Sequence, residues 1–360
     1  MLAGHRARVV GVDNVNTGAC VTRQCEQVNT LTVKQANALA AVAVTGGAFA
    51  QATMTGAIAY GFQSDTTSSN VTTSGFGMED AEINFAVSED LDGVGKLSAG
   101  LGLGWGGSGT GATANDSNIT LALSGGMKVV MKSAKGAEYL TGGVAGAGAN
   151  FEADLTYAGL LSRTRNDSVG VSLPIAEGTT LSVTHSESEV AIGAGSAANV
   201  GILQTTTATT ATVQPYDTVV LGYKAGGLVV DAQYRTYGRQ ETNSTVYANT
   251  KNRLSASYDL GAAKIGAGVD TTMYTYGNSN TKTLVGLTIP MGALTLGAQM
   301  LSVTASGNAT STSNYTRTGA LAGGMYSLSK RTYLTGQYYT SDVGGTSNQN
   351  GYLFSMYNTF

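Results

Sequence analysis

The sequence predicts an all-β protein, a transmembrane antiparallel β-barrel of fourteen to sixteen strands, and three observations support this prediction. Beyond residue 51, apolar residues alternate with small or polar residues in segments of about ten, which is the pattern of strands. Only 12% of all residues are charged, whereas a soluble surface carries roughly a quarter to a third. Short and long connections alternate between the segments, as in membrane barrels whose two ends face different compartments.

The composition excludes two other classes of protein. Glycine occupies 50 of 360 positions and the mean hydropathy is only +0.02. No stretch supplies the ~20 consecutive apolar residues of a spanning helix, so a helical membrane protein is excluded. The net charge of -3 leaves no surplus of lysine and arginine to neutralise phosphates, so we expect no nucleic-acid partner.

Residues 1–50 differ from the rest of the chain and are interpreted as a leader. Lys34 precedes an apolar stretch, Leu39–Ala50, whose small residues Ala48 and Ala50 are typical of a signal peptide cleaved before Gln51. Residues 1–27 are either an artefact of the assigned start or part of a long genuine leader. Both cysteines lie in this stretch, so residues 51–360 form one cysteine-free barrel domain with no cofactor or metal site expected.

The clearest alternation lies in residues 96–105, where lysine, serine and glycine occupy the second face. The apolar face consists of Leu97, Ala99, Leu101, Leu103 and Trp105. A β-sandwich would turn this face inward to a dry core, whereas a membrane barrel turns it outward to lipid. A face of glycine, serine and threonine with scattered charges suits a wet lumen, so we favour the barrel.

Aromatic residues at strand ends support the membrane interpretation. Trp105 closes one apolar row, and Tyr352 and Phe360 share a face in the last predicted strand. A tilted strand of this length covers the apolar band of ~25 Å, so the two rings could lie in opposite interfacial girdles.

The connections indicate the size of the barrel. Short turns are expected at 91–95, 224–227 and 291–292, and the uncertain strands lie within 192–213. Longer polar stretches are expected at 64–74, 106–117, 192–215, 239–251, 306–315 and 341–350. Sixteen strands would take about nineteen residues each with their connections, and a barrel of that size leaves an aqueous channel.

Two segments near the end of the sequence resemble a known family. Residues 326–334, Tyr-Ser-Leu-Ser-Lys-Arg-Thr-Tyr-Leu, resemble a segment of Gram-negative trimeric porins of the β-proteobacterial type. Residues 356–360 are similar to the aromatic-terminated strand that this family uses as its assembly signal, which includes Phe360. Weaker similarities lie at 52–56, 88–93 and 166–174, so the resemblance spans nearly all of residues 51–360.

The resemblance implies a sixteen-stranded, homotrimeric diffusion channel whose third extracellular loop folds inward, here near residues 136–150. By position, Glu138 would be the acidic residue of this loop. The basic residues facing it on the wall would be Lys128, Lys132, Arg163 and Arg165. The loop is rich in glycine and alanine and carries no other charge, so a wide constriction is as compatible with it as a selective one.

Alternation adds further candidates for the lumen. Glu152 and Asp154 lie opposite an apolar face and belong either to the lumen or to a solvated rim, while Asp231 and Arg235 lie opposite Tyr234 and its apolar neighbours. Residues 51–360 contain 16 basic and 21 acidic residues, which favours cations at long range. The basic wall candidates favour anions, so the sign of the ion selectivity stays open.

We therefore predict a passive outer-membrane channel for small hydrophilic solutes and ions, embedded in outer-membrane lipid. The alternative is a secreted structural or adhesive β-protein of a surface layer or fibre. An enzyme built on a barrel would need a nucleophile, a base and an orienting group, and His185 with Ser186 is only a local pair. We therefore expect no catalytic activity.

Overall fold

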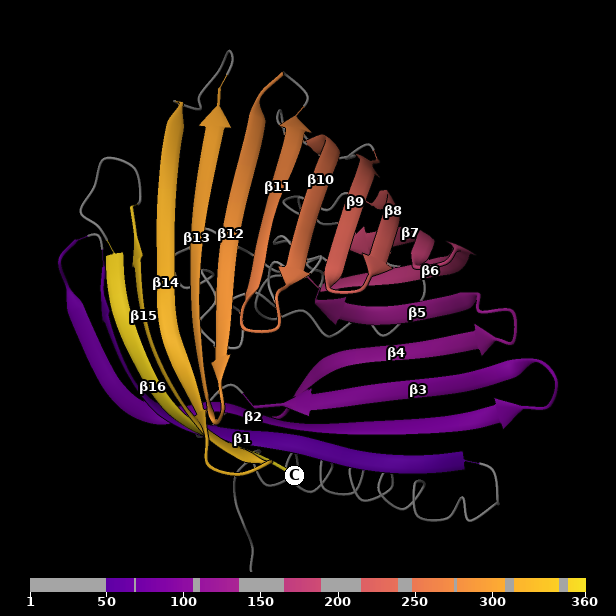
Figure 1. Cartoon of the computed structure of the whole chain (residues 1–360), viewed down its shortest axis with the longest axis horizontal. Helices are drawn as coiled ribbons and strands as arrows, with labels where there is room; N and C mark the ends of the chain where they lie inside the picture. Colours follow the sequence, from indigo (N-terminus) through magenta and orange to yellow (C-terminus); the bar gives the residue numbers. More distant parts are fainter. Residues whose placement is uncertain are drawn as a thin grey trace, which may run out of the picture. The chain divides into compact units, whose positions relative to one another are not determined.

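A computed structural model describes residues 50–67, 69–105, 111–135, 165–188, 215–238, 248–274, 277–307, 314–342 and 349–360. The chain divides into two compact units, Met1–Ala50 and Gln51–Phe360, and the second contains the barrel. In the described residues, sixteen strands follow one another around a closed ring in chain order (Figure 1). The first strand pairs with the last, which confirms the upper end of the predicted strand number.

The strands vary in length, and the first two are the longest. They are β1 (Ala50–Thr66), β2 (Thr72–Leu91), β3 (Gly95–Gly104), β4 (Thr113–Leu123), β5 (Lys128–Lys135), β6 (Arg165–Ala176), β7 (Thr179–Ser188), β8 (Tyr216–Ala225), β9 (Leu228–Tyr237), β10 (Ala248–Asp259), β11 (Lys264–Tyr274), β12 (Ser279–Met291), β13 (Leu294–Ser306), β14 (Tyr315–Ser327), β15 (Thr332–Ser341) and β16 (Gln349–Thr359). No helix in the described ranges has the length and apolar character needed to cross a membrane.

All seven connections at one end of the barrel are tight turns of two to four residues, whereas seven of the eight connections at the other end are longer. Glycines with positive φ make the tightest of these turns possible: Gly178 has φ 67° and Gly226 has φ 55°. Two-residue hairpins need this left-handed backbone, which glycine adopts without a steric penalty. The other end carries the longer connections, including 136–164 and 189–215, so the predicted alternation of connection lengths is confirmed.

Side chains alternate around the ring as a membrane barrel requires. In β10, Leu254 and Tyr258 are exposed by 52% and 46%, whereas Arg253 and Ser255 are exposed by only 5% and 1%. Leu101 of β3 is likewise exposed on the outer face. The apolar face therefore points away from the barrel axis and the polar face points inward, as predicted.

The inner face also carries apolar residues on some strands. Leu284, Leu301, Leu321 and Leu353 lie on the inner face of β12, β13, β14 and β16, and all are buried. Leu284 and Leu301 lie directly opposite each other in register, so they remove each other's surface from water. Both faces of β12 carry apolar residues, and alternation alone therefore gives no inner or outer assignment there.

Several strands begin earlier or end later than the sequence indicates. The stretch 64–74 was expected to be a loop, but β1 continues to Thr66 and β2 begins at Thr72. Likewise β4 begins at Thr113, inside the expected loop 106–117. Backbone pairing continues here beyond the apolar band, where both faces meet water and the alternating pattern is lost. The uncertain strands within 192–213 lie outside the described residues.

The barrel closes along the seam between β1 and β16. The backbone N–H of Gly56 donates to the carbonyl of Phe360, and the N–H of Phe360 donates back to Gly56, both at 3.0 Å. A Cβ atom at Gly56 would lie 2.4 Å from the Phe360 ring, so the ring rests where only glycine leaves room. Tyr352 and Phe360 are exposed on the outer face of this strand, as predicted.

Candidate functional site

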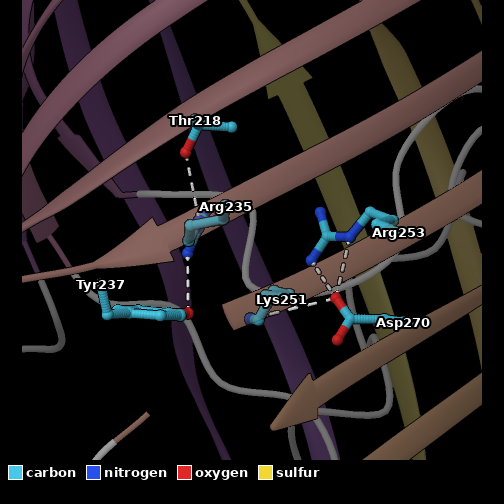
Figure 2. A network of polar contacts seen from close by, with 6 residues as sticks. All are labelled: Thr218, Arg235, Tyr237, Lys251, Arg253 and Asp270. Atoms are coloured by element: carbon cyan, nitrogen blue, oxygen red, sulfur yellow. Dashed lines mark hydrogen bonds and ion pairs between the residues drawn. The ribbon is translucent and has the colours of Figure 1, made fainter. Parts of the chain in front are cut away.

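Two basic residues on the inner face of the barrel share one buried carboxylate. Figure 2 shows Arg253 on β10 donating through Nε and Nη2 to Asp270 Oδ2 on β11, at 2.9 and 2.6 Å. Lys251 Nζ lies 3.9 Å from the same oxygen, and all three side chains are at least nine-tenths buried. Cross-strand register causes this contact, since Arg253 lies directly opposite Asp270.

Arg235 on β9 is held by neutral partners. Its Nε donates to Thr218 Oγ1 at 3.2 Å and its Nη1 to the Tyr237 hydroxyl at 3.3 Å (Figure 2). The guanidinium carbon also lies 3.9 Å from the centroid of the Tyr216 ring, a cation–π contact. Arg235 lies opposite Lys251 in register, so two like charges face each other on neighbouring strands.

The register extends these cations into a row across the inner wall. Lys282 on β12 lies opposite Asp270, and Val303 on β13 separates Lys282 from Arg317 on β14. The Arg317 guanidinium carbon is 4.6 Å from the centroid of the Tyr315 ring. We call this set the basic row, and it consists of Arg235, Lys251, Arg253, Lys282 and Arg317.

Two further lysines face the lumen from β5, a quarter of the way around the ring from β9. Lys128 and Lys132 alternate with Met131 on β5, and Met131 is exposed on the outer face. Lys132 lies opposite Ser168 of β6, and both lysines are exposed. Unlike the basic row, these two charges are therefore open to water on the inner wall.

Carboxylates gather on the inner face of the first two strands. Asp65 accepts hydrogen bonds from Gln63 Nε2 at 2.5 Å and from the Tyr339 hydroxyl at 2.6 Å. Glu79 accepts a hydrogen bond from the Ser355 hydroxyl on β16. Carboxylates held by such donors stay in fixed positions on the wall.

Glu82 completes this group on β2. Its two carboxylate oxygens accept from Asn84 Nδ2 at 3.1 Å and from Asn115 Nδ2 at 3.3 Å. We call Asp65, Glu79 and Glu82 the acidic strip. In a closed ring of sixteen strands, β1 and β2 lie half-way around from β9 and β10, so the acidic strip and part of the basic row occupy opposite sides.

The decisive comparison concerns the whole sequence. The sequence profile of Gram-negative porins matches residues 38–346, which is most of the chain. The chain belongs to the Gram-negative porin family. Its barrel is therefore a diffusion channel of the bacterial outer membrane.

Solved structures agree with this assignment at the level of the fold. An anion-selective porin from Comamonas acidovorans matches with a TM-score of 0.60 and 16% identity, covering 86% of this chain and 100% of that one. A loop-deletion mutant of OmpT from Vibrio cholerae matches with a TM-score of 0.62 and 13% identity, covering 86% of this chain and 99% of that one. A mutant of the Rh. blastica porin matches with a TM-score of 0.59 and 14% identity, covering 86% of this chain and 100% of that one. A search of curated protein sequences found no match.

The structure places some of the predicted site residues of this porin and not others. Asp231, like Arg235, lies on the inner face of β9, and it faces Ser255 of β10. Arg165 is the first residue of β6 and lies opposite Lys135 in register. Trp105 directly follows β3, and its backbone N–H donates to Ala81. Four predicted residues lie outside the described residues: Glu138, Glu152, Asp154 and Arg163.

Sequence reasoning missed most of the basic row and the whole acidic strip. Glu82 was on the polar side of an alternating segment, so its position was available from the pattern. Lys251 and Asp65 lay in stretches expected to be loops, which concealed them. The pairing of Arg253 with Asp270 depends on strand register, which alternation does not specify.

His185 lies on the outer face of β7, away from the lumen. His185 shares this face with Val183. Its Nδ1 atom lies 2.8 Å from Asp217 Oδ1, and its Nε2 atom lies 3.9 Å from Glu187 Oε1. Ser186, the next residue of the strand, is buried on the opposite, inner face, so it does not lie beside His185. Within the described part of the porin, no group of three or more histidine, cysteine or acidic residues could hold a metal ion.

Proposed function

We propose that this porin conducts small hydrophilic solutes and ions with a preference for anions. The observation that carries the proposal is the unequal distribution of charge on the inner wall. The described residues located above include seven cations, the five of the basic row with Lys128 and Lys132, against five carboxylates, the acidic strip with Asp231 and Asp270. A lumen with surplus positive charge concentrates anions.

The separation of the two signs supports a second part of the proposal. The acidic strip lies half-way around the ring from the members of the basic row on β9 and β10, so the field between these groups runs across the pore. Such a field orients dipolar solutes as they pass, and it acts only over a Debye length of ~8 Å at physiological salt. The similarly folded porin from Comamonas acidovorans is anion-selective, which agrees with the proposed sign.

Reconstitution in a planar bilayer tests this function. The purified protein should insert as discrete conductance steps, and under a potassium chloride gradient the reversal potential should lie toward the equilibrium potential of chloride. A reversal potential toward potassium would contradict the proposed sign. Correctly assembled protein that never opened a pore would contradict the channel itself.

We also propose that the porin assembles as a homotrimer in outer-membrane lipid, as its family resemblance suggests. A heat-modifiable oligomer in detergent extracts of outer membranes is the expected result. Release by salt or a chelator would instead favour a secreted surface-layer protein, for which no comparison gives support. We propose no enzymatic step, and replacing His185 should leave conductance unchanged.

Two further proposals concern segments outside the described residues. Residues 136–150 would supply the inward constriction loop, with Glu138 as its acid facing basic residues of the wall. Cleavage before Gln51 would remove the leader. Amino-terminal sequencing of the outer-membrane form should therefore show Gln51 as its first residue. A first residue upstream of Ala50 would contradict this proposal.

A further inference from the structure

The inner wall contains a small cavity that the channel function does not require. It has a volume of about 180 Å³ and lies on the inner faces of β5, β6 and β7. Its polar lining consists of Lys132, Ser168, Ser172, Ser182 and Thr184. One ammonium group and four hydroxyl groups therefore converge on one concave surface.

Strand register brings these residues together from three strands. Lys132 lies opposite Ser168, and Ser172 lies opposite Ser182 on the next strand. The Ser182 hydroxyl donates to the Ser172 oxygen at 3.0 Å. Because the Ser172 oxygen is engaged as an acceptor, its own hydroxyl hydrogen is available to donate into the cavity.

Gly170 keeps the cavity open. It lies between Ser168 and Ser172 on the same inner face and opposite Thr184. A Cβ atom at Gly170 would lie 2.6 Å from Thr184 Oγ1, closer than real Cβ atoms approach. Any larger residue would therefore displace the threonine hydroxyl from its present place.

The chemistry of the lining selects one class of ligand. Lysine supplies three hydrogen-bond donors and a full positive charge, and each hydroxyl can supply one more donor. No carboxylate lines this cavity among the residues that the structure describes, and Lys132 makes no ion pair with any of them. The volume is several times the space that one water molecule needs, so the cavity has room for a small anion.

We propose that this cavity, the β5–β7 pocket, binds a small oxyanion such as phosphate or a short carboxylate during its passage through the pore. An ion with several oxygen atoms can accept from the lysine and from hydroxyls on two strands at once, which chloride cannot match. This inference rests on the proposed channel function and adds a saturable step to it.

Single-channel conductance as a function of inorganic phosphate concentration tests the proposal. The wild-type porin should saturate in phosphate while chloride conductance rises linearly over the same range. Lys132→Gln should raise the half-saturating phosphate concentration by about tenfold or more, because a charge-assisted hydrogen bond is lost. Linear conductance in phosphate for the wild type would overturn the pocket while leaving the channel intact.

Lys128→Gln is the matched control. It removes the same charge from the same face of β5, but Lys128 does not line the pocket. The two variants should lose anion preference to a similar degree, while only Lys132→Gln loses phosphate saturation. Equal shifts of the half-saturating concentration in both variants would show that general lumen charge, and not a pocket, is responsible.

Gly170→Ala fills the pocket without changing any charge. It should abolish phosphate saturation while chloride conductance stays near the wild-type value. Should this variant fail to assemble, Thr184→Val removes one donor with little change of shape and should raise the half-saturating concentration. Acetate in place of phosphate extends the test to carboxylates, and the wild-type conductance should saturate in acetate as well.

Discussion

Among the described residues, Asp270 is the buried carboxylate that faces both Arg253 and Lys251 on the wall. Its Oδ2 atom receives two hydrogen bonds from Arg253 and lies near Lys251 Nζ. The exposed fraction of Asp270 is 1%, so water cannot replace this carboxylate if it is removed. Asp270 therefore stabilises the buried side chains of Arg253 and Lys251, and this matters more for the basic row than the one negative charge that it adds.

We predict that Asp270→Asn destabilises the barrel by about 3–5 kcal/mol, the usual cost of breaking a buried ion pair by removing one partner. The midpoint of thermal unfolding of the detergent-solubilised protein measures this loss. Asp92→Asn is the control, since it removes the same charge from an exposed turn. Equal midpoints for the two variants would contradict the role assigned to Asp270.

Strand existence was predictable from the sequence, whereas strand ends and partners were not. The segment 96–105 shows strict alternation because one of its faces meets lipid, and β3 lies there. The ends of β1 and β2 extend into polar sequence such as 64–74, where no face needs apolar residues. Cross-strand contacts such as Arg253 with Asp270 arise from register, so their geometry could not be obtained from alternation.

The closure of β1 on β16 leads to a prediction at the scale of elements. Gly56→Ala places a methyl group 2.4 Å from the Phe360 ring and 2.5 Å from the backbone oxygen of Glu82, so the seam must shift. We expect a loss of about 1–3 kcal/mol, as for other overpacked sites, measured as a lower temperature of heat modification on gels. Gly77→Ala is the control because its Cβ would meet nothing within 4 Å.

In the molecule as a whole, the acidic strip and the start of the basic row lie on strands that are far apart in the ring. The acidic strip lies on β1 and β2, while the basic row begins half-way around the ring at β9 and has Asp231 and Asp270 interspersed with it. The two groups come from distant parts of the sequence, so only closure of the barrel sets them against each other. Selectivity is thus a property of the complete ring.

Neutralising one member of the acidic strip tests this separation. Glu82→Gln should raise the permeability ratio of chloride to potassium by about twofold, since a unit charge ~8 Å from an ion in water contributes ~0.5 kcal/mol. The reversal potential under a salt gradient gives this ratio. A ratio that fell, or that matched the wild type, would contradict the contribution of the strip to the field.

The pairing of β1 with β16 also constrains how the protein can be made. One edge of β1 has no partner until the final strand has been synthesised, so a partial chain exposes an unsatisfied row of backbone groups. Such edges recruit other chains and promote aggregation. Premature termination anywhere before β16 would therefore leave this edge of β1 unpaired and the ring open.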